Sequence, residues 1–170
     1  TSGASTIVGQ SNAAGAITLG AVNYPNTPEF GVSPPIVQQF SSRGGMLIDG
    51  ISRNKPDLIA PNGGNTTVNL FWPNIDGDLF PNFFGTSAAA PHAAAVGALV
   101  KHGKQKFYGL DMTPAEIKSL LTSTALDMYS SGYDTASGAG YIQPYEAMLT
   151  FAPPTPHLLS LHYDTNIIPA

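Results

Sequence analysis

The feature that most limits the fold is an alanine-rich stretch with almost no polar face. It reads "TSAAAPHAAAVGALVKHG" and occupies residues 86–103. A helix that is apolar on most sides has to be covered on most sides, whereas a surface helix carries a polar stripe. We therefore expect a helix that begins at Thr86 or Ser87, ends at Gly103 and is the most buried helix of the protein. Pro91 is compatible with this helix because it lies near the first turn, where amide donors are unpaired anyway.

Short apolar runs predict strands before this helix, and two later segments predict further helices. The runs at 14–24 and 57–60 are each followed by turn residues, as expected of buried strands. In "MTPAEIKSLLTSTA", Thr113 is predicted to cap a helix, with a proline next and Glu116 completing a capping box. Residues 143–151 predict a short third helix. This alternation favours an α/β fold with a mostly parallel sheet and flanking helices.

Composition excludes several classes of function. The 170 residues carry a net charge of −4, and the seven Lys and Arg are scattered, so no basic face for nucleic acid is expected. The absence of cysteine excludes disulfides and thiolate metal sites. The longest apolar run, 88–100, is interrupted by Pro91 and His92 and is too short for a membrane span. The small polar residues at the start suggest a piece taken from a longer protein.

The pattern of strands and helices ends at residue 151. Residues 152–170 contain four prolines and no helical period. We therefore predict one domain at 1–151, followed by a linker at 152–170 that holds at most one strand or leads into a following segment.

Ser87 permits two interpretations on position alone. A serine hydroxyl is a weak nucleophile that needs a base and donors for the developing oxyanion, and a helix N-terminus supplies free amides and positive potential. Gly85 would let a substrate approach closely. Serine is also among the commonest helix N-caps, and capping serines far outnumber catalytic ones. Position alone therefore favours the cap.

Several segments together favour the nucleophile instead of the cap, because they resemble the subtilisin-like serine proteases, or subtilases. "GTSAAAPH" (85–92) is similar to the serine motif of that family, Gly-Thr-Ser followed by small residues and Pro-His. Further segments resemble the family in the same order: "AITLGAVNY" (16–24), "FSSRG" (40–44), "KPDLIAPNGG" (55–64), the Thr-Pro-x-x-Ile-Lys helix and "GAGYIQPYEA" (138–147). The resemblance covers most of residues 7–151. It departs at Ala88, where the family often has methionine, and at "APNGG", which stands in place of the family's Ala-Pro-Gly and shifts a turn by one residue.

The resemblance implies a site and a function. Ser87 is expected to be the nucleophile of a serine endopeptidase, and its own amide would donate to the oxyanion. Gly85 and Thr86 would line the cleft that binds a polypeptide substrate, and Gly9 would contribute to the pocket for a substrate side chain. The family also implies a secreted protein, in the extracellular space or the cell envelope.

The groups that would activate Ser87 are not expected in this chain. Subtilisin carries its triad in the order Asp, His, Ser, whereas all four histidines here follow Ser87. His92 lies about 140° around the helix from Ser87, so we expect it to pack against a neighbour. His102 suits the negative end of the helix, and His157 and His162 lie in the tail. The N-terminal half of the domain is thus expected to be absent and the isolated chain inactive.

A second function remains open, and one is excluded. The chain could belong to a non-catalytic binding or structural module on a subtilase scaffold, a pseudoenzyme, depending on whether the Asp and His motifs are intact. A lipase-like nucleophile elbow is excluded because alanine stands where Gly-x-Ser-x-Gly needs its second glycine.

Two further expectations concern metals and partners. Asn74, Asp76 and Asp78 alternate as in a calcium loop, but the required glycine and glutamate are missing, so we predict a solvated turn and no cofactor. The resemblance alone leaves calcium open. The apolar strand within 16–22 is expected to have a neighbour on one side only, which predicts a homo-oligomer or swapped dimer, or a rearranged N-terminal segment, that covers it.

Overall fold

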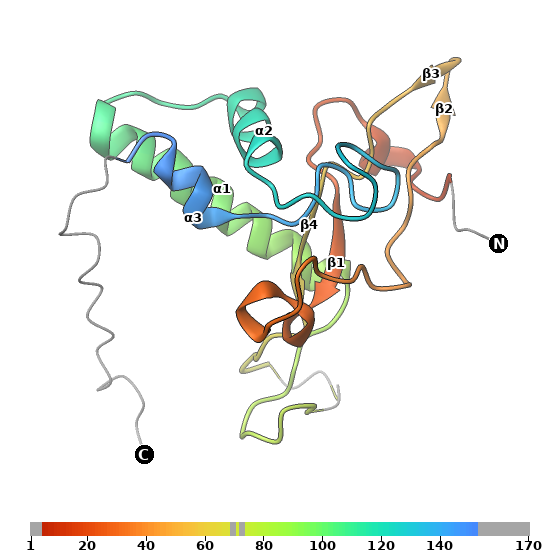
Figure 1. The fold of residues 1–170 in the computed structure, drawn as a ribbon, viewed down its shortest axis with the longest axis vertical. Helices are drawn as coiled ribbons and strands as arrows, with labels where there is room; N and C mark the ends of the chain where they lie inside the picture. Colours follow the sequence, from red (N-terminus) through yellow and green to blue (C-terminus); the bar gives the residue numbers. More distant parts are fainter. Residues whose placement is uncertain (1–4, 69–70, 72–73, 153–170) are drawn as a thin grey trace.

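Two parallel strands form the centre of the fold. The computed structural model describes residues 5–68, 71 and 74–152. Strand β1 (Leu19–Asn23) pairs in parallel with β4 (Leu58–Asn62) (Figure 1). Tyr141 extends the parallel arrangement through a bridge to Ile59. The predicted linker lies outside the described residues, except for Ala152.

Helices flank this parallel pair, so the predicted α/β class is confirmed. Helix α1 packs across both strands, and α3 runs beside it (Figure 1). The remaining elements, in order, are the 3-10 turns η1 (Gly9–Asn12), η2 (Tyr24–Asn26) and η3 (Pro28–Phe30), the hairpin strands β2 (Leu47–Ile48) and β3 (Ile51–Ser52), and the helices α1 (Thr86–Tyr108), α2 (Pro114–Ser123) and α3 (Pro144–Leu149).

The first strand is shorter than its apolar run predicts. Residues 14–18 form a turn and an extended segment, and regular pairing starts only at Leu19. As predicted, β1 has one strand neighbour in the described part of the chain. Along its other edge, β1 is hydrogen-bonded to the segment 37–41: Gln38 N donates to Ala21 O (2.8 Å), and Ala21 N donates to Ser41 Oγ (2.9 Å). The middle of that edge is therefore paired with a loop.

Helix α1 does not end at Gly103. It continues to Tyr108 and ends at Gly109, whose φ is 69° and whose N–H donates to Gln105 O (2.8 Å). Gly103 is buried instead, and a Cβ there would lie 2.7 Å from Met148 Cε of α3. The predicted stop signal is thus a site of close helix packing.

As predicted, α1 is the most buried of the described helices, but it is covered on one side only. One side is buried against the sheet and the other helices: Ala88, Ala89, Ala93, Gly97, Val100 and Gly103. The opposite side is exposed although it is also apolar, and Leu99 keeps 47% of its surface accessible. The exposed alanines of this side include Ala94, Ala95 and Ala98. We refer to Ala94, Ala95, Ala98 and Leu99 as the outer face of α1.

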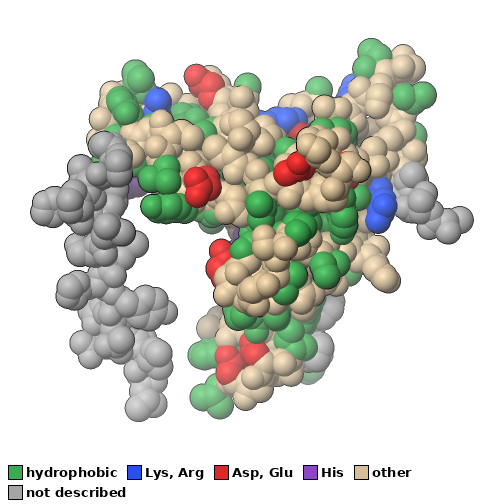
Figure 2. All heavy atoms as spheres, in the orientation of Figure 1, with side chains coloured by type: hydrophobic (Ala, Val, Ile, Leu, Met, Phe, Trp, Pro, Cys, Tyr) green, Lys and Arg blue, Asp and Glu red, His purple; other side chains and the backbone are tan. Residues whose placement is uncertain are grey.

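The surface carries few charges. Lys and Arg side chains are dispersed among uncharged and hydrophobic ones on the face drawn in Figure 2. In the part of the chain that is described, no helix has the length and hydropathy to cross a membrane.

Replacing Gly140 tests a positive φ and a close backbone contact at the same position. Its φ is 119°, and a Cβ would lie 2.1 Å from Leu126 O. We expect Gly140→Ala to cost about 3 kcal/mol or more, because both strain and backbone overlap have to be relieved. Gly109→Ala is the matched control, since its φ is also positive but nothing lies within 4 Å of the added Cβ. Thermal unfolding midpoints that fall equally for both variants would contradict the packing.

The capping box of α2 predicts a pH dependence. Glu116 accepts hydrogen bonds from Thr113 N and Thr113 Oγ1 (both 2.7 Å), and these lower the pKa of its carboxyl below 4.5. A lowered pKa stabilises the folded state above the unfolded pKa, and the contribution is lost as pH falls through the folded value. The advantage of wild type over Glu116→Gln in unfolding midpoint should therefore shrink between about pH 6 and pH 3. A constant difference over that range would contradict the prediction.

Candidate active site

Ser87 is the second residue of α1 and is exposed. The N-cap is Gly85, with φ 101° and ψ 173°, a conformation that favours glycine. Gly85 O accepts from Ala88 N (3.0 Å) and Ala89 N (3.2 Å), which closes the first turn. Ser87 therefore begins the helix as predicted, but it is not the cap, and its hydroxyl is not used to cap the helix.

The start of α1 is fixed by a buried asparagine at the end of β4. Asn62 is 1% exposed, and its Oδ1 accepts from Gly85 N (3.1 Å) while its Nδ2 donates to Val22 O (2.8 Å). One side chain thus ties the helix N-terminus to both central strands. The sequence did not predict this role, because Asn62 lies in "APNGG", a pattern that is typical of a turn.

The first amides of α1 are available beside the Ser87 hydroxyl. Thr86 N and Ser87 N precede the point at which intrahelical bonding starts, and no described residue accepts from them. Together with the helix dipole they create positive potential at this point. Such a position suits the stabilisation of an oxyanion.

A groove of about 450 Å³ lies beside Ser87. Thr86, Ser87 and Ala90 line it from α1, and Gln10, Ser11 and the segment 16–19 line it from the N-terminal part of the chain. We call residues 10–11 and 16–19 the opposing wall.

Thr86 also lines a second cavity of about 240 Å³, which includes Val8 and Phe40. Gly9 lies in η1 with φ 61° and lines neither cavity, although its neighbours Val8 and Gln10 each line one. The structure therefore brings Ser87 and Thr86 together with the neighbours of Gly9, not with Gly9 itself. Gly85 supports the site from the N-cap.

The histidines lie away from the groove. His92 is exposed, and its Nδ1 is 2.7 Å from Ala88 O one turn earlier, so the expectation that it packs against a neighbour is wrong. His102 is exposed in the body of α1, because the helix extends to Tyr108 and Lys106 occupies its last turn. His157 and His162 lie outside the described residues. Neither His92 nor His102, the two histidines that the structure describes, lines a cavity beside Thr86.

The acidic loop after residue 73 is held by hydrogen bonds. Asp76 Oδ2 accepts from Tyr24 OH (2.8 Å) and from Nδ2 of the buried Asn82 (3.0 Å), and the bond from Asn82 is the main reason that the pKa of Asp76 is lowered. Asn74 Oδ1 accepts from Gly77 N (2.7 Å), which closes a local turn. In the described ranges no three His, Cys, Asp or Glu side chains gather in a way that could hold a metal ion.

Sequence comparison identifies the family. The profile described as the Subtilase family matches residues 1–140. The chain belongs to the subtilase family. Subtilisin-like protease SBT2.4 of Arabidopsis thaliana is 32% identical over 143 residues, covering 70% of this chain and 17% of that protein. Subtilisin-like protease SBT4.12 of the same plant is 34% identical over 131 residues, again 70% of this chain and 17% of the relative.

Solved subtilase structures have the same fold. Fervidolysin from Fervidobacterium pennivorans, a keratinolytic enzyme related to subtilisin, matches with a TM-score of 0.54 and 28% identity over 82% of this chain and 20% of its own. The CspB protease of Clostridium perfringens matches with a TM-score of 0.64 and 22% identity over 89% of this chain and 30% of its own. The chain therefore spans less than a third of each of these subtilases, and it has the fold of an incomplete α/β domain.

Asn62 should be essential for the start of α1. We expect Asn62→Ala in the full-length protein to cost about 1–3 kcal/mol, because it leaves Gly85 N and Val22 O without their buried partner. Asn74→Ala is the control, since Asn74 also makes two hydrogen bonds but is exposed. Thermal unfolding would refute the role of Asn62 if both variants lost the same stability.

Proposed function

We propose that residues 1–151 are the C-terminal part of the catalytic domain of a subtilisin-like serine endopeptidase, with Ser87 as its nucleophile. The observation that supports this most is the exposed hydroxyl of Ser87 at the second position of α1, beside unpaired amides and a groove. Gly85 caps the helix, so the hydroxyl is not needed for capping. The segment 152–170 is proposed to be a linker or the start of a following segment.

The proposed reaction is acyl transfer to serine. Ser87 Oγ attacks the carbonyl carbon of a peptide bond, and its proton passes to a general base while Ser87 N donates to the oxyanion. The C–N bond then breaks, the amine leaves with a proton from the same base, and water hydrolyses the acyl-enzyme. Thr86 and Gly85 lie at the cleft, and Gly9 contributes through the loop that carries Val8 and Gln10.

The general base is proposed to come from polypeptide outside these 170 residues. None of the histidines in the described ranges lines the groove beside Ser87, and His157 and His162 follow the domain. The isolated chain should therefore be inactive. The proposed partner of the full-length enzyme is a polypeptide substrate, and the proposed location is extracellular or in the cell envelope.

The outer face of α1 and the single-neighbour strand β1 support one further proposal for the isolated chain. An exposed apolar face favours association, and the segment 37–41 pairs only part of the β1 edge, so a homo-oligomer or swapped dimer is expected. A pseudoenzyme on the same scaffold is the alternative function, and intact or substituted Asp and His motifs in the full-length protein discriminate between the two.

Ser87→Ala decides between the two functions. In the full-length protein, a fluorophosphonate probe should label Ser87, because such reagents need an activated serine. Ser87→Ala should abolish labelling and lower peptidase kcat by about 10⁶, as expected when the nucleophile is lost. Ser123→Ala is the control, since Ser123 is an exposed serine on α2.

The isolated 170-residue chain should resist the same probe. Stoichiometric labelling of this chain would show that it holds a base of its own. A full-length protein that is neither labelled nor active would establish the pseudoenzyme instead.

A further inference from the structure

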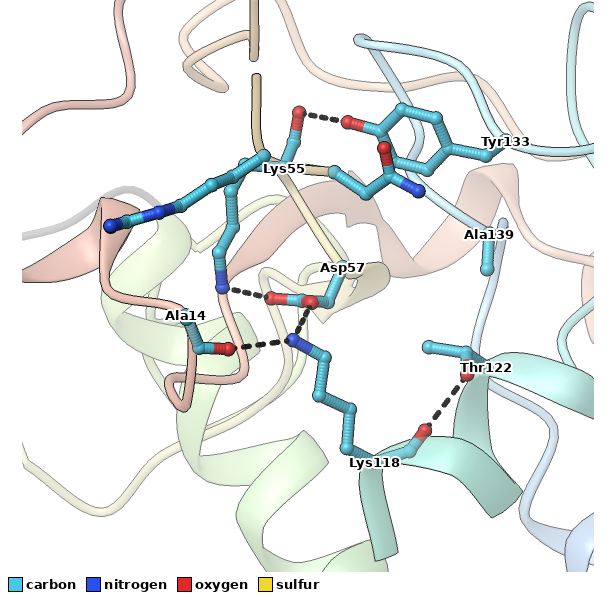
Figure 3. Close-up of a pocket in the computed structure, with 9 residues that line it drawn as sticks. Ala14, Lys55, Asp57, Lys118, Thr122, Tyr133 and Ala139 are labelled. Carbon is cyan, nitrogen blue, oxygen red and sulfur yellow. Dashed lines mark hydrogen bonds and ion pairs between the residues drawn. The ribbon is translucent and has the colours of Figure 1, made fainter. Parts of the chain in front are cut away.

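Asp57 is the centre of a buried cluster of three charges. It is 4% exposed, and its Oδ2 accepts from Lys55 Nζ (2.7 Å) (Figure 3). The same oxygen accepts from Thr18 N (2.7 Å). Lys118 of α2 pairs with the other carboxylate oxygen, Oδ1. Lys55 is 1% exposed. Residues far apart in the sequence therefore meet at one carboxylate next to β4.

Both ammonium groups also bind the backbone that precedes β1. Lys55 Nζ donates to Ala16 O (2.5 Å), and Lys118 Nζ donates to Ala14 O (3.3 Å) and Ala16 O (3.4 Å). With the bond from Thr18 N to Asp57, the cluster makes four hydrogen bonds to the segment 14–18. Regular strand pairing starts only at Leu19, although Thr18 O also accepts from Asp57 N (2.8 Å) and Leu58 N (3.3 Å). The cluster therefore adds side-chain anchors to the part of the segment that precedes Thr18.

The segment 14–18 continues directly into the groove beside Ser87. Ala16 and Thr18 belong to the opposing wall, and Thr18 Oγ1 donates to Ser11 O (2.5 Å), which ties the two parts of that wall together. The position of the wall relative to Ser87 thus depends on the charges behind it.

The buried charges are not expected to add much to the free energy of unfolding, because burial disfavours their charged forms. Burial lowers the pKa of Lys55, which means that the buried site disfavours its charge even though the hydrogen bond from Lys55 to Asp57 opposes this effect. Replacing buried ion pairs with apolar residues is often neutral or stabilising, so such clusters are better explained by the geometry that they enforce.

A cavity of about 390 Å³ lies beside the cluster. It does not change the interpretation that the three charges hold the backbone of the segment 14–18. It is lined by Arg53, Lys55 and Lys118 among others. The three N–H groups of Lys118 are matched by three acceptors: Asp57 Oδ1, Ala14 O and Ala16 O. Arg53 already donates to Asn12 O (2.5 Å). The donors of Lys118 are thus directed at Asp57 and at the backbone of the segment 14–18.

We propose that Lys55, Asp57 and Lys118 are positioning residues for substrate binding: they hold the opposing wall at a fixed place across the groove from Ser87. This inference rests on the proposed function. They do not touch the reacting atoms, so their loss should weaken substrate binding more than it slows chemistry at Ser87.

Lys118→Met in the full-length protein tests the proposal. This variant keeps the length of the side chain and removes its three donors. Fluorophosphonate labelling of Ser87 counts the active sites and should proceed within about twofold of the wild-type rate, because a small probe needs only the activated serine. KM for a peptide substrate should rise about tenfold, while kcat, calculated per labelled site, should change less than about threefold. Lys118→Arg should restore KM, since it keeps the charge and the donors.

Lys101→Met is the matched control, because it breaks the exposed pair of Lys101 with Asp111 (3.0 Å), which lies on the surface. Its KM should equal that of wild type. A KM for Lys118→Met that equals the control, with normal labelling, would overturn the positioning role and leave the proposed function standing. Wild-type protein that is not labelled would overturn the proposed function and this inference with it.

Thr18→Val decides the question if Lys118→Met does not fold. It removes only the hydroxyl that bonds to Ser11 O and keeps the shape of the side chain. KM should rise about threefold in this variant with labelling unchanged. An unchanged KM would overturn the proposal.

Discussion

Strand β4 carries a buried polar side chain near each end, and both walls of the groove beside Ser87 depend on these two residues. Asp57, just before the strand, binds Thr18 N and the two lysines that bind the segment 14–18. Asn62, the last residue of the strand, binds Gly85 N and Val22 O. Because a strand is a rigid spacer of five residues here, the distance between the opposing wall and the start of α1 is set by β4 itself.

The two anchors use different chemistry for the same purpose. Asn62 makes neutral hydrogen bonds that satisfy backbone groups which burial would otherwise leave unpaired. Asp57 instead requires two buried or half-buried ammonium groups, whose desolvation offsets much of their attraction. The apolar core between the anchors supplies the stabilisation, with Ala21, Leu58, Ala60 and Ala89 fully buried. Small residues at these positions let α1 lie close to the strands, so the polar anchors can reach the backbone groups that they bind.

Local signals predicted the elements well, and long-range contacts account for what was missed. The capping box at Thr113 is confirmed because its partners lie three residues apart. The end of α1 was misplaced because Gly103 is explained only by Met148, which lies on another helix. The hairpin β2–β3 was not predicted, although Asp49 and Gly50, between the apolar residues Ile48 and Ile51, carry the usual signal for a tight turn. The bonds from Lys118 to Ala14 and Ala16 join residues more than a hundred positions apart.

The exposed outer face of α1 and the proposed need of Ser87 for a base from elsewhere can be explained together. A helix selected to face water would carry polar residues on that side, whereas here alanines and Leu99 stand there. Their composition is that of a buried face, as the apolar stretch 86–103 led us to expect. Ser87 lies in the first turn of the same helix. Under the proposed function, polypeptide outside these 170 residues that supplies the base to Ser87 would approach the helix that carries the outer face, so one segment would serve both needs.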